Sequence, residues 1–191
     1  DFYIIEDDYL SEFIYDENIK YETLKYMDKN NRVIYIKSLS KSFMPGIRLG
    51  YMVIPKNLIE EMKMSKVNTD IATSSLMQRT LDLYIKKGYL QEYINLKNMK
   101  YKENYFLFKE LADLYLKDKI SYFDPGGGLY FYLNLENKNI NSEELFYRLI
   151  EKGVYTTPGT LFYRKSNKGY NVLRVCFTNL CEKKLENGIK I

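Results

Sequence analysis

The stretch from Tyr89 to Leu116 constrains the fold of this chain more than any other segment. It contains neither glycine nor proline, and its apolar side chains recur at helical spacing. These include Tyr93, Leu96, Tyr105, Phe108, Leu111 and Tyr115. A helix of about 28 residues is about 42 Å long, which is long for one compact domain. The stretch therefore predicts a long helix that connects two lobes.

Three short apolar runs before this helix predict strands, at residues 2–5, 33–38 and 49–54. The apolar character of the second and third runs is continuous rather than alternating, as in a sheet that is covered on both faces. Pro55 opens a helical pattern of about ten residues. A second helical pattern, from Ala72 to Lys87, ends at Gly88. The first lobe is therefore expected to be α/β.

The residues after the long helix predict a smaller lobe of mixed α and β structure. Strands are expected at 120–123, 129–133 and 172–177, and helices at 142–153 and from 182 onward. Ser142 is the predicted N-cap of its helix. Cys176 alternates with apolar residues and is expected to be a buried small side chain. The glycine run 126–128 precedes a strand and not a helix, so we interpret it as a turn beside a substrate entrance and not as a dinucleotide-binding loop.

The composition excludes several classes of function. The 191-residue chain has no histidine, so it supplies neither a Ser-His-Asp or Cys-His catalytic set nor imidazole ligands for zinc. Its net charge of +4 is spread over interleaved acids and bases, which is typical of a solvated surface and not of a nucleic-acid interface. Its two cysteines form no Cys-x-x-Cys pair and indicate a reducing compartment. No apolar run reaches the roughly 18–20 residues of a membrane span, and no signal-peptide pattern opens the chain, so a cytoplasmic location is expected.

The run around Lys41 carries the strongest indication of chemistry. Lys41 lies just beyond the predicted strand at 33–38, with Ser38 and Ser40 before it and Arg48 after a Pro-Gly turn. A lysine in this place can form a covalent bond with a carbonyl carbon. Hydroxyl groups and an arginine suit a phosphate.

A second polar cluster, Asp7, Asp8 and Tyr9, follows the first predicted strand. Together with the lysine and the phosphate-binding groups, an Asp/Tyr pair makes up what a pyridoxal phosphate site requires. A metal site formed by Asp7, Asp8 and Glu12 is the alternative interpretation of the same acidic cluster.

These segments resemble the class I/II aminotransferases, the fold type I family that depends on pyridoxal 5'-phosphate (PLP). The resemblance rests on Glu6–Phe13 and on Ser38-x-Ser40-Lys41-x-x-x-Pro45-Gly46-x-Arg48-x-Gly50. Three later segments agree with it, at 127–130, 154–159 and 173–177. Within the family, the chain is most similar to the aminotransferase-like domain of MocR/GntR-type transcriptional regulators, and it matches the C-terminal half of that domain.

The resemblance implies an α/β fold of the aspartate aminotransferase-like type, with a mixed, mostly parallel sheet in a large domain and a small α+β C-terminal domain. Residues 1–88 are then the C-terminal half of the PLP-binding large domain, residues 89–118 the connecting helix, and residues 119–191 the small domain. The chain begins inside a strand pattern and stops inside a helical one, so we expect a fragment.

The resemblance also implies the roles of individual residues. Lys41 would form a Schiff base with the cofactor and later move a proton. Asp7 would hold the proton on the cofactor ring nitrogen, and Tyr9 would donate to the ring oxygen. Adjacent strand residues point to opposite faces, so Asp8 is the competing candidate for the role of Asp7.

The remaining predicted site residues bind anions. Ser38, Ser40 and Arg48 would hold the cofactor phosphate, with Arg48 acting through its bidentate fork. Arg174 matches the family arginine that pairs with the substrate carboxylate, and a structural salt bridge is its alternative role. The site is expected to contain no metal.

Three functions remain open at this point. The first is a PLP-binding domain of a MocR-type regulator that exchanges its Schiff base with an amino acid or amine, forms a homodimer and meets DNA only through an upstream domain absent here. The second is a free-standing aminotransferase that uses an amino acid and a 2-oxo acid. The third is a non-catalytic dimerisation fragment. In the family, the aromatic residue that stacks on the cofactor ring and the loop that binds its phosphate both lie upstream of the residue that Asp7 matches.

Overall fold

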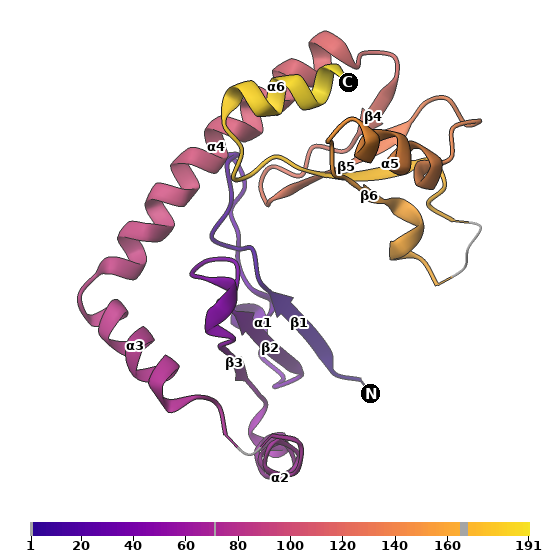
Figure 1. The fold of residues 1–191 in the computed structure, drawn as a ribbon. Helices are drawn as coiled ribbons and strands as arrows, with labels where there is room; N and C mark the ends of the chain where they lie inside the picture. Colours follow the sequence, from indigo (N-terminus) through magenta and orange to yellow (C-terminus); the bar gives the residue numbers. More distant parts are fainter. Residues whose placement is uncertain (1, 71, 165–167) are drawn as a thin grey trace. The chain divides into compact units, whose positions relative to one another are not determined.

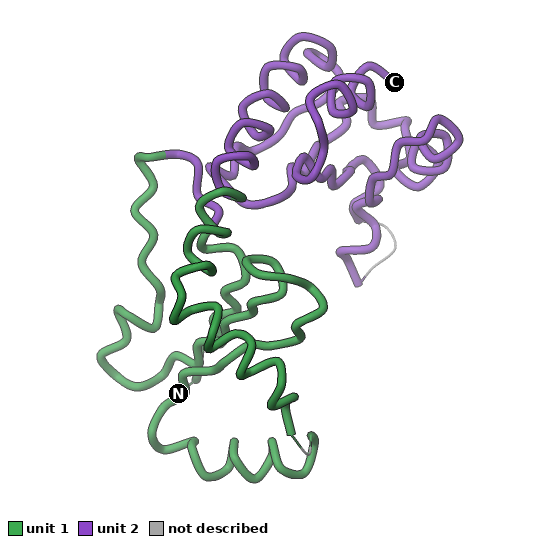
Figure 2. The backbone as a smooth tube through the Cα atoms, turned by 60° about the vertical axis from the view of Figure 1, so that its left-hand side comes forward, with its two compact units in different colours: residues 1–12, 17–97 green, residues 13–16, 98–191 purple. Residues whose placement is uncertain are grey.

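The computed structural model describes residues 2–70, 72–164 and 168–191 of the chain. The chain forms two compact units, which we describe separately (Figure 2). Unit 1 comprises residues 1–12 and 17–97, and unit 2 comprises residues 13–16 and 98–191. The predicted long helix is confirmed as α4, Tyr89–Tyr115, and the boundary between the units falls inside it. Among the described helices, none is both long and apolar enough to cross a lipid bilayer.

Unit 1 contains a mixed three-stranded sheet with the order β1-β2-β3 (Figure 1). β1 (Ile4–Asp8) pairs in parallel with β2 (Val33–Ser38), and β3 (Gly50–Val53) pairs with β2 in the antiparallel direction. A strand is present in each of the three predicted places, but β1 begins and ends later than the predicted residues 2–5 and includes Asp7 and Asp8. The parallel register sets Asp8 beside Lys37, so the two polar clusters of the sequence follow neighbouring strands at the same end of the sheet.

The expectation that this sheet is covered on both faces is wrong for β1 and β3. Val33, Ile34 and Tyr35 of β2 are buried. In contrast, Ile5 is 67% exposed, and every residue of β3 is exposed. A continuous apolar pattern predicts burial only where other elements supply the cover, and the described elements of unit 1 do not cover these two strands.

The helices of unit 1 are short. They are α1 (Leu24–Met27), α2 (Ile59–Thr69) and α3 (Ser75–Lys86), with 3₁₀ turns at Pro45–Ile47 and Lys56–Leu58. Ser74 caps α3 by accepting from the Met77 N–H, and Gly88, with a φ of 76°, follows its end as predicted. A hydrophobic cluster of Phe43, Ile47 and Leu49 packs against Leu39 and against residues of α3 and the start of α4.

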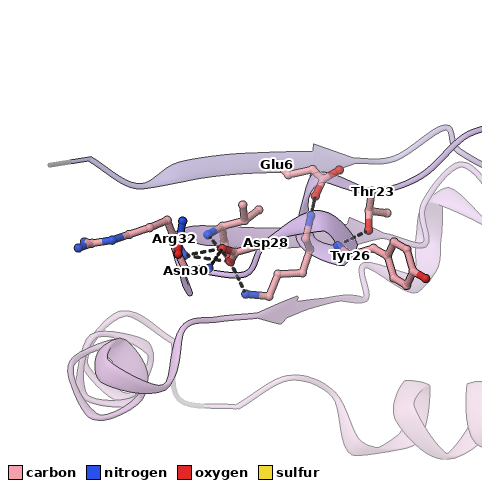
Figure 3. A network of polar contacts seen from close by, with 8 residues as sticks. Glu6, Thr23, Tyr26, Asp28, Asn30 and Arg32 are labelled. Atoms are coloured by element: carbon pink, nitrogen blue, oxygen red, sulfur yellow. Dashed lines mark hydrogen bonds and ion pairs between the residues drawn. The ribbon is translucent and has the colours of Figure 1, made fainter.

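A carboxylate at the amino end of β2 organises the turn that leads into this strand (Figure 3). Asp28 accepts hydrogen bonds from the N–H groups of Asn30, Arg32 and Val33, and it pairs with Lys25 at 3.3 Å. These donors hold the pKa of Asp28 well below its usual value, at about 2. The carboxylate of Glu6 accepts from the first two N–H groups of α1. The start of β2 is thereby fixed by side chains as well as by the sheet.

Unit 2 contains an antiparallel four-stranded sheet with the order β4-β5-β7-β6. Its strands are β4 (Ile120–Tyr122), β5 (Tyr130–Leu135), β6 (Thr157–Pro158) and β7 (Val172–Cys176). Its other elements are α5 (Ser142–Glu151), α6 (Glu182–Lys190) and a 3₁₀ turn at Gly159–Phe162. Phe131 is fully buried and stacks on Phe108 of α4 with ring centroids 4.4 Å apart. The core thus lies between the sheet and the second half of α4.

Two details of unit 2 differ from the sequence interpretation, and a third, at Gly127, adds to it. Asn141 caps α5 by accepting from the Glu143 N–H, whereas Ser142 is buried and donates to the Gly169 carbonyl. Cys176 is exposed, because strand alternation turns it away from the core face that holds Phe131. Gly127 packs against the backbone of Phe13, where a Cβ atom would collide, so the glycine run serves a close backbone approach.

Candidate functional site

The loop that carries Lys41 is held at both ends and leaves the lysine side chain outside. It runs from Leu39 to Leu49, and the Leu39 N–H donates to the Leu49 carbonyl at 3.1 Å. Phe43 anchors it in the hydrophobic cluster, with its ring 4.8 Å from that of Tyr84. Lys41 is exposed, and its amine forms no hydrogen bond or ion pair with the described residues.

A cation from α4 supports the backbone of the same loop. Lys97 Nζ lies 3.4 Å from the carbonyl oxygens of Lys41 and Phe43, and it also lies 4.6 Å from the centroid of the Tyr93 ring. The positive charge therefore contacts the main chain on either side of Ser42. The Ser42 hydroxyl is buried and has no hydrogen-bond partner among the described residues.

The backbone around Arg48 is strained. Arg48 adopts the left-handed conformation with a φ of 50°, directly after the turn at Pro45–Ile47. This conformation costs a non-glycine residue about 1–2 kcal/mol. Two residues later, Gly50 lies so close to β2 that a Cβ atom would be 2.6 Å from the Lys37 carbonyl oxygen. The Arg48 side chain is exposed, and its guanidinium forms no hydrogen bond or ion pair with the described residues.

At the end of β1, the two adjacent acids lie on opposite faces. Asp8 is 5% exposed and accepts hydrogen bonds from Tyr35 Oη at 2.6 Å, Ser11 Oγ at 2.8 Å and Lys37 Nζ at 3.2 Å. Asp7 is exposed, and its carboxylate forms no such bond within the described part of the chain. The acid that remains available to a ligand is therefore Asp7. Tyr9 is likewise exposed and has no hydrogen-bond partner among the described residues.

Electrostatics keep Asp8 ionised. Burial alone would raise its pKa, but hydrogen bonds from Tyr35, Ser11 and Lys37 outweigh burial and hold the pKa of Asp8 below its ordinary value. Burial and the bond to Asp8 together raise the pKa of Tyr35. Lys37 also pairs with Glu12 at 2.9 Å. Asp8 and Glu12 thus bind an ammonium group, and among the described residues no three acids or cysteines lie close enough to hold a metal ion, which argues against the metal site formed by Asp7, Asp8 and Glu12.

Arg174 lies on β7 of unit 2 and is partly buried. Its Nη2 donates to Thr157 Oγ1 at 3.1 Å, and its guanidinium lies 4.5 Å from the ring centroid of Tyr130 and 5.0 Å from that of Phe162. Within the described residues, no carboxylate pairs with it, so the salt-bridge alternative has no partner there. Aromatic rings orient the cation while leaving donors for an anion.

Six of the seven predicted site residues lie together in unit 1. Asp7 lies near the end of β1 and Tyr9 follows this strand, while Ser38 ends β2 and is followed by Ser40, Lys41 and Arg48. The carboxyl ends of neighbouring parallel strands are where α/β sheets bind ligands. The Ser38 hydroxyl accepts weakly from the Ser40 N–H, at 3.4 Å. Arg174 belongs to the other unit.

Sequence reasoning missed Lys37, although a signal was present. This lysine interrupts an otherwise apolar strand that was expected to be covered, and a charged residue in such a place requires partners. Its partners come from the turn after β1, which lies 25 or more positions earlier in the chain.

The whole chain is similar to known proteins. The family model for aminotransferase class I and II matches residues 1–191. An uncharacterized aminotransferase of Saccharolobus solfataricus is 32% identical over 190 residues, which cover 100% of this chain and 47% of that protein. An uncharacterized HTH-type transcriptional regulator of Bacillus subtilis is 31% identical over 186 residues, which cover 97% and 38%.

The fold of the chain is also similar to that of a solved aminotransferase structure. The kynurenine aminotransferase of Pyrococcus horikoshii, crystallised in complex with PMP, superposes with a TM-score of 0.89 at 32% identity, over 99% of this chain and 46% of that one. The chain thus spans less than half the length of each of these three proteins.

Proposed function

Because the chain belongs to the class I and II aminotransferase family and shares the fold predicted for it, we propose that it binds PLP through Lys41 and acts on an amino acid or amine. One observation carries the proposal. At the carboxyl ends of β1 and β2, the side chains of Asp7, Tyr9, Lys41 and Arg48 are exposed and unpaired among the described residues, whereas their neighbours Asp8 and Lys37 are buried and bound to each other. The free groups are the ones a ligand can use.

The chemistry of these groups fits the cofactor. The amine of Lys41 suits the aldehyde, the carboxylate of Asp7 suits a protonated ring nitrogen, and Arg48 with Ser38 and Ser40 suits the phosphate. When bound, PLP supplies an aldehyde that condenses with an amine with loss of water, and a ring that withdraws electrons. The PMP in the related crystal structure supports this choice of cofactor.

The residues of this chain would then act in sequence. Asp7 holds a proton at the ring nitrogen, and Tyr9 donates a hydrogen bond to the ring oxygen. Lys41 would hold the cofactor until an amino compound takes its place, and its free amine would then take the proton from the substrate α-carbon and return it as the general acid. Arg174 binds the carboxylate of an amino acid through its unused donors.

The biological role we favour is the effector-sensing part of a MocR-type regulator that forms a homodimer and reaches DNA through a separate domain. The HTH-type relative and the segment Glu6–Phe13 support this role. A free-standing aminotransferase is the second candidate, supported by the relative of that description in S. solfataricus. A regulator binds the amino compound without turnover, whereas an enzyme passes its amino group to a 2-oxo acid, so amino-group transfer between two substrates distinguishes them.

The test of the proposal is covalent labelling. The chain is mixed with PLP, its absorbance spectrum is recorded, and the adduct is reduced with borohydride and mapped by mass spectrometry. We expect a new absorbance band and a label confined to Lys41, which Lys41→Ala abolishes. Lys63→Ala, which alters an exposed lysine of α2 in the same unit, is the matched control and should label as the unaltered chain does. A label spread over many lysines, or none, would overturn the proposal and favour a non-catalytic dimerisation role.

A further inference from the structure

Lys37 places a buried ammonium group beside the proposed cofactor site. The residue is 5% exposed. Its Nζ lies 3.2 Å from Asp8 Oδ1, 2.7 Å from Ser11 Oγ and 2.9 Å from Glu12 Oε1. Three N–H donors thus meet three oxygens, so the hydrogen-bonding capacity of the ammonium is fully used.

All three oxygens come from residues 8–12, which comprise the last residue of β1 and the turn that follows it. The turn also has internal bonds, because Ser11 donates to Asp8 through its N–H at 3.1 Å and through its hydroxyl at 2.8 Å. Tyr9 lies inside this turn, and Asp7 directly precedes it. Lys37 therefore joins β2 to the segment that presents two of the proposed cofactor groups.

The main chain of Lys37 has a second neighbour. Lys37 pairs with Asp8 in the parallel register and with Tyr51 in the antiparallel one. Its carbonyl oxygen is the atom that a Cβ on Gly50 would meet at 2.6 Å. The residue thus lies where the segments bearing Asp7, Lys41 and Arg48 come together.

We propose that Lys37 is a positioning residue, whose ammonium group keeps Asp7 and Tyr9 aligned with Lys41 without itself touching the cofactor. The inference rests on the proposed function, since it concerns the same site. Lys37 does not compete with Lys41 for the aldehyde, because its amine is buried against Asp8, Ser11 and Glu12, whereas Lys41 is exposed. A displacement of about 1 Å at a reacting group can cost about 100-fold in rate, so a link of this kind matters.

The test compares a lysine near the carboxyl end of β2 with a lysine of α1 that binds the first residue of β2. Lys37→Met keeps the apolar stem and removes the donors. Lys25→Met is the matched control, because Lys25 Nζ pairs with Asp28 at 3.3 Å and donates to the Val33 carbonyl at 2.8 Å, at the other end of the strand. Both changes remove a partly or fully buried ion pair, so both lower the stability of unit 1.

The readouts separate positioning from stability. In the chain without cofactor, we expect Lys37→Met to speed hydrogen exchange at the Ser11 amide, and Lys25→Met to speed it at the amides of Arg32 and Val33. With PLP, only Lys37→Met should raise the concentration needed for half-maximal labelling of Lys41, by about tenfold or more. Ser11→Ala removes one acceptor without stranding a charge, so it gives the same pattern more weakly should Lys37→Met fail to fold.

Each outcome bears on one proposal at a time. If the unaltered chain does not label at Lys41, the proposed function fails, and the exchange experiment still decides whether Lys37 holds the turn. Equal exchange at Ser11 in the Lys37 and Lys25 variants would overturn the positioning role. That role also fails if Lys37→Met labels at the same PLP concentration as the unaltered chain.

Discussion

Replacing Gly50 with alanine should disturb the site from a position that carries no functional group. The added Cβ atom would lie 2.6 Å from the Lys37 carbonyl oxygen, whereas ordinary contacts begin at 3.4 Å, so β2 and β3 must separate locally by about 0.8 Å. The pairs Ser38↔Gly50 and Lys37↔Tyr51 lie at this point. Both sides of the contact are backbone, so no side chain can rotate to relieve it.

The size of the effect follows from this geometry. Overpacking of a well-packed site costs about 1–3 kcal/mol, and each weakened ladder hydrogen bond costs about 0.5–1.5 kcal/mol. We therefore expect Gly50→Ala to lower the free energy of unfolding by about 2–4 kcal/mol. It should also weaken PLP labelling of Lys41, because Arg48 and Lys41 lie in the loop that Gly50 closes.

Gly46→Ala is the control from the same loop. A Cβ atom on Gly46 meets nothing within 4 Å, so this change should be neutral or stabilising by about 0.4–1 kcal/mol, through the unfolded state. Urea unfolding followed by circular dichroism measures both variants. If Gly50→Ala proves as stable as Gly46→Ala and labels equally well, the close contact does not constrain the loop and the reasoning is refuted.

Two further predictions concern charge. The pKa of Asp8 is lowered from its ordinary value of 3.8 in the folded chain, so the stabilisation that its carboxylate contributes is complete above pH 3.8 and is lost as the pH falls below it. Urea unfolding between about pH 6 and about pH 2 should show this loss. Asp8→Asn should remove that part of the pH dependence. An unchanged acid limb in Asp8→Asn would contradict the assignment. Arg174→Gln should weaken displacement of the Lys41-bound cofactor by amino acids about 10- to 100-fold, as expected for a charged hydrogen bond worth about 1.5–3 kcal/mol, and should leave displacement by the corresponding amine without a carboxylate unchanged. Equal weakening for both compounds would show that Arg174 does not bind the carboxylate.

Local patterns in the sequence were sufficient for the elements and for the lysine motif. Apolar spacing and helix-ending residues correctly predicted the helix from Tyr89, the strand Val33–Ser38 and the end of α3 before Gly88. These features depend on residues only a few positions apart in the sequence. The lysine motif is equally local, since it is defined by the number of residues between positions of a single loop.

The burial and the hydrogen-bond partners of a side chain could not be predicted from such local patterns, because they depend on residues far away in the sequence. Alternation along β1 shows that Asp7 and Asp8 point to opposite faces, but only the pairing with β2 decides that Asp8 faces Tyr35 and Lys37. The same holds for Cys176, whose exposure follows from which face of its sheet meets the core.

The sequence by itself therefore indicated that reactive residue types stand at the ends of two predicted strands. The tertiary structure alone decided which of them remain free, because burial and ion pairing are set by segments far apart in the chain. Lys37 illustrates the division. Its charge is visible in the sequence, but its three partners are brought to it only when β1 and β2 pair and the turn at residues 8–12 closes over its ammonium group.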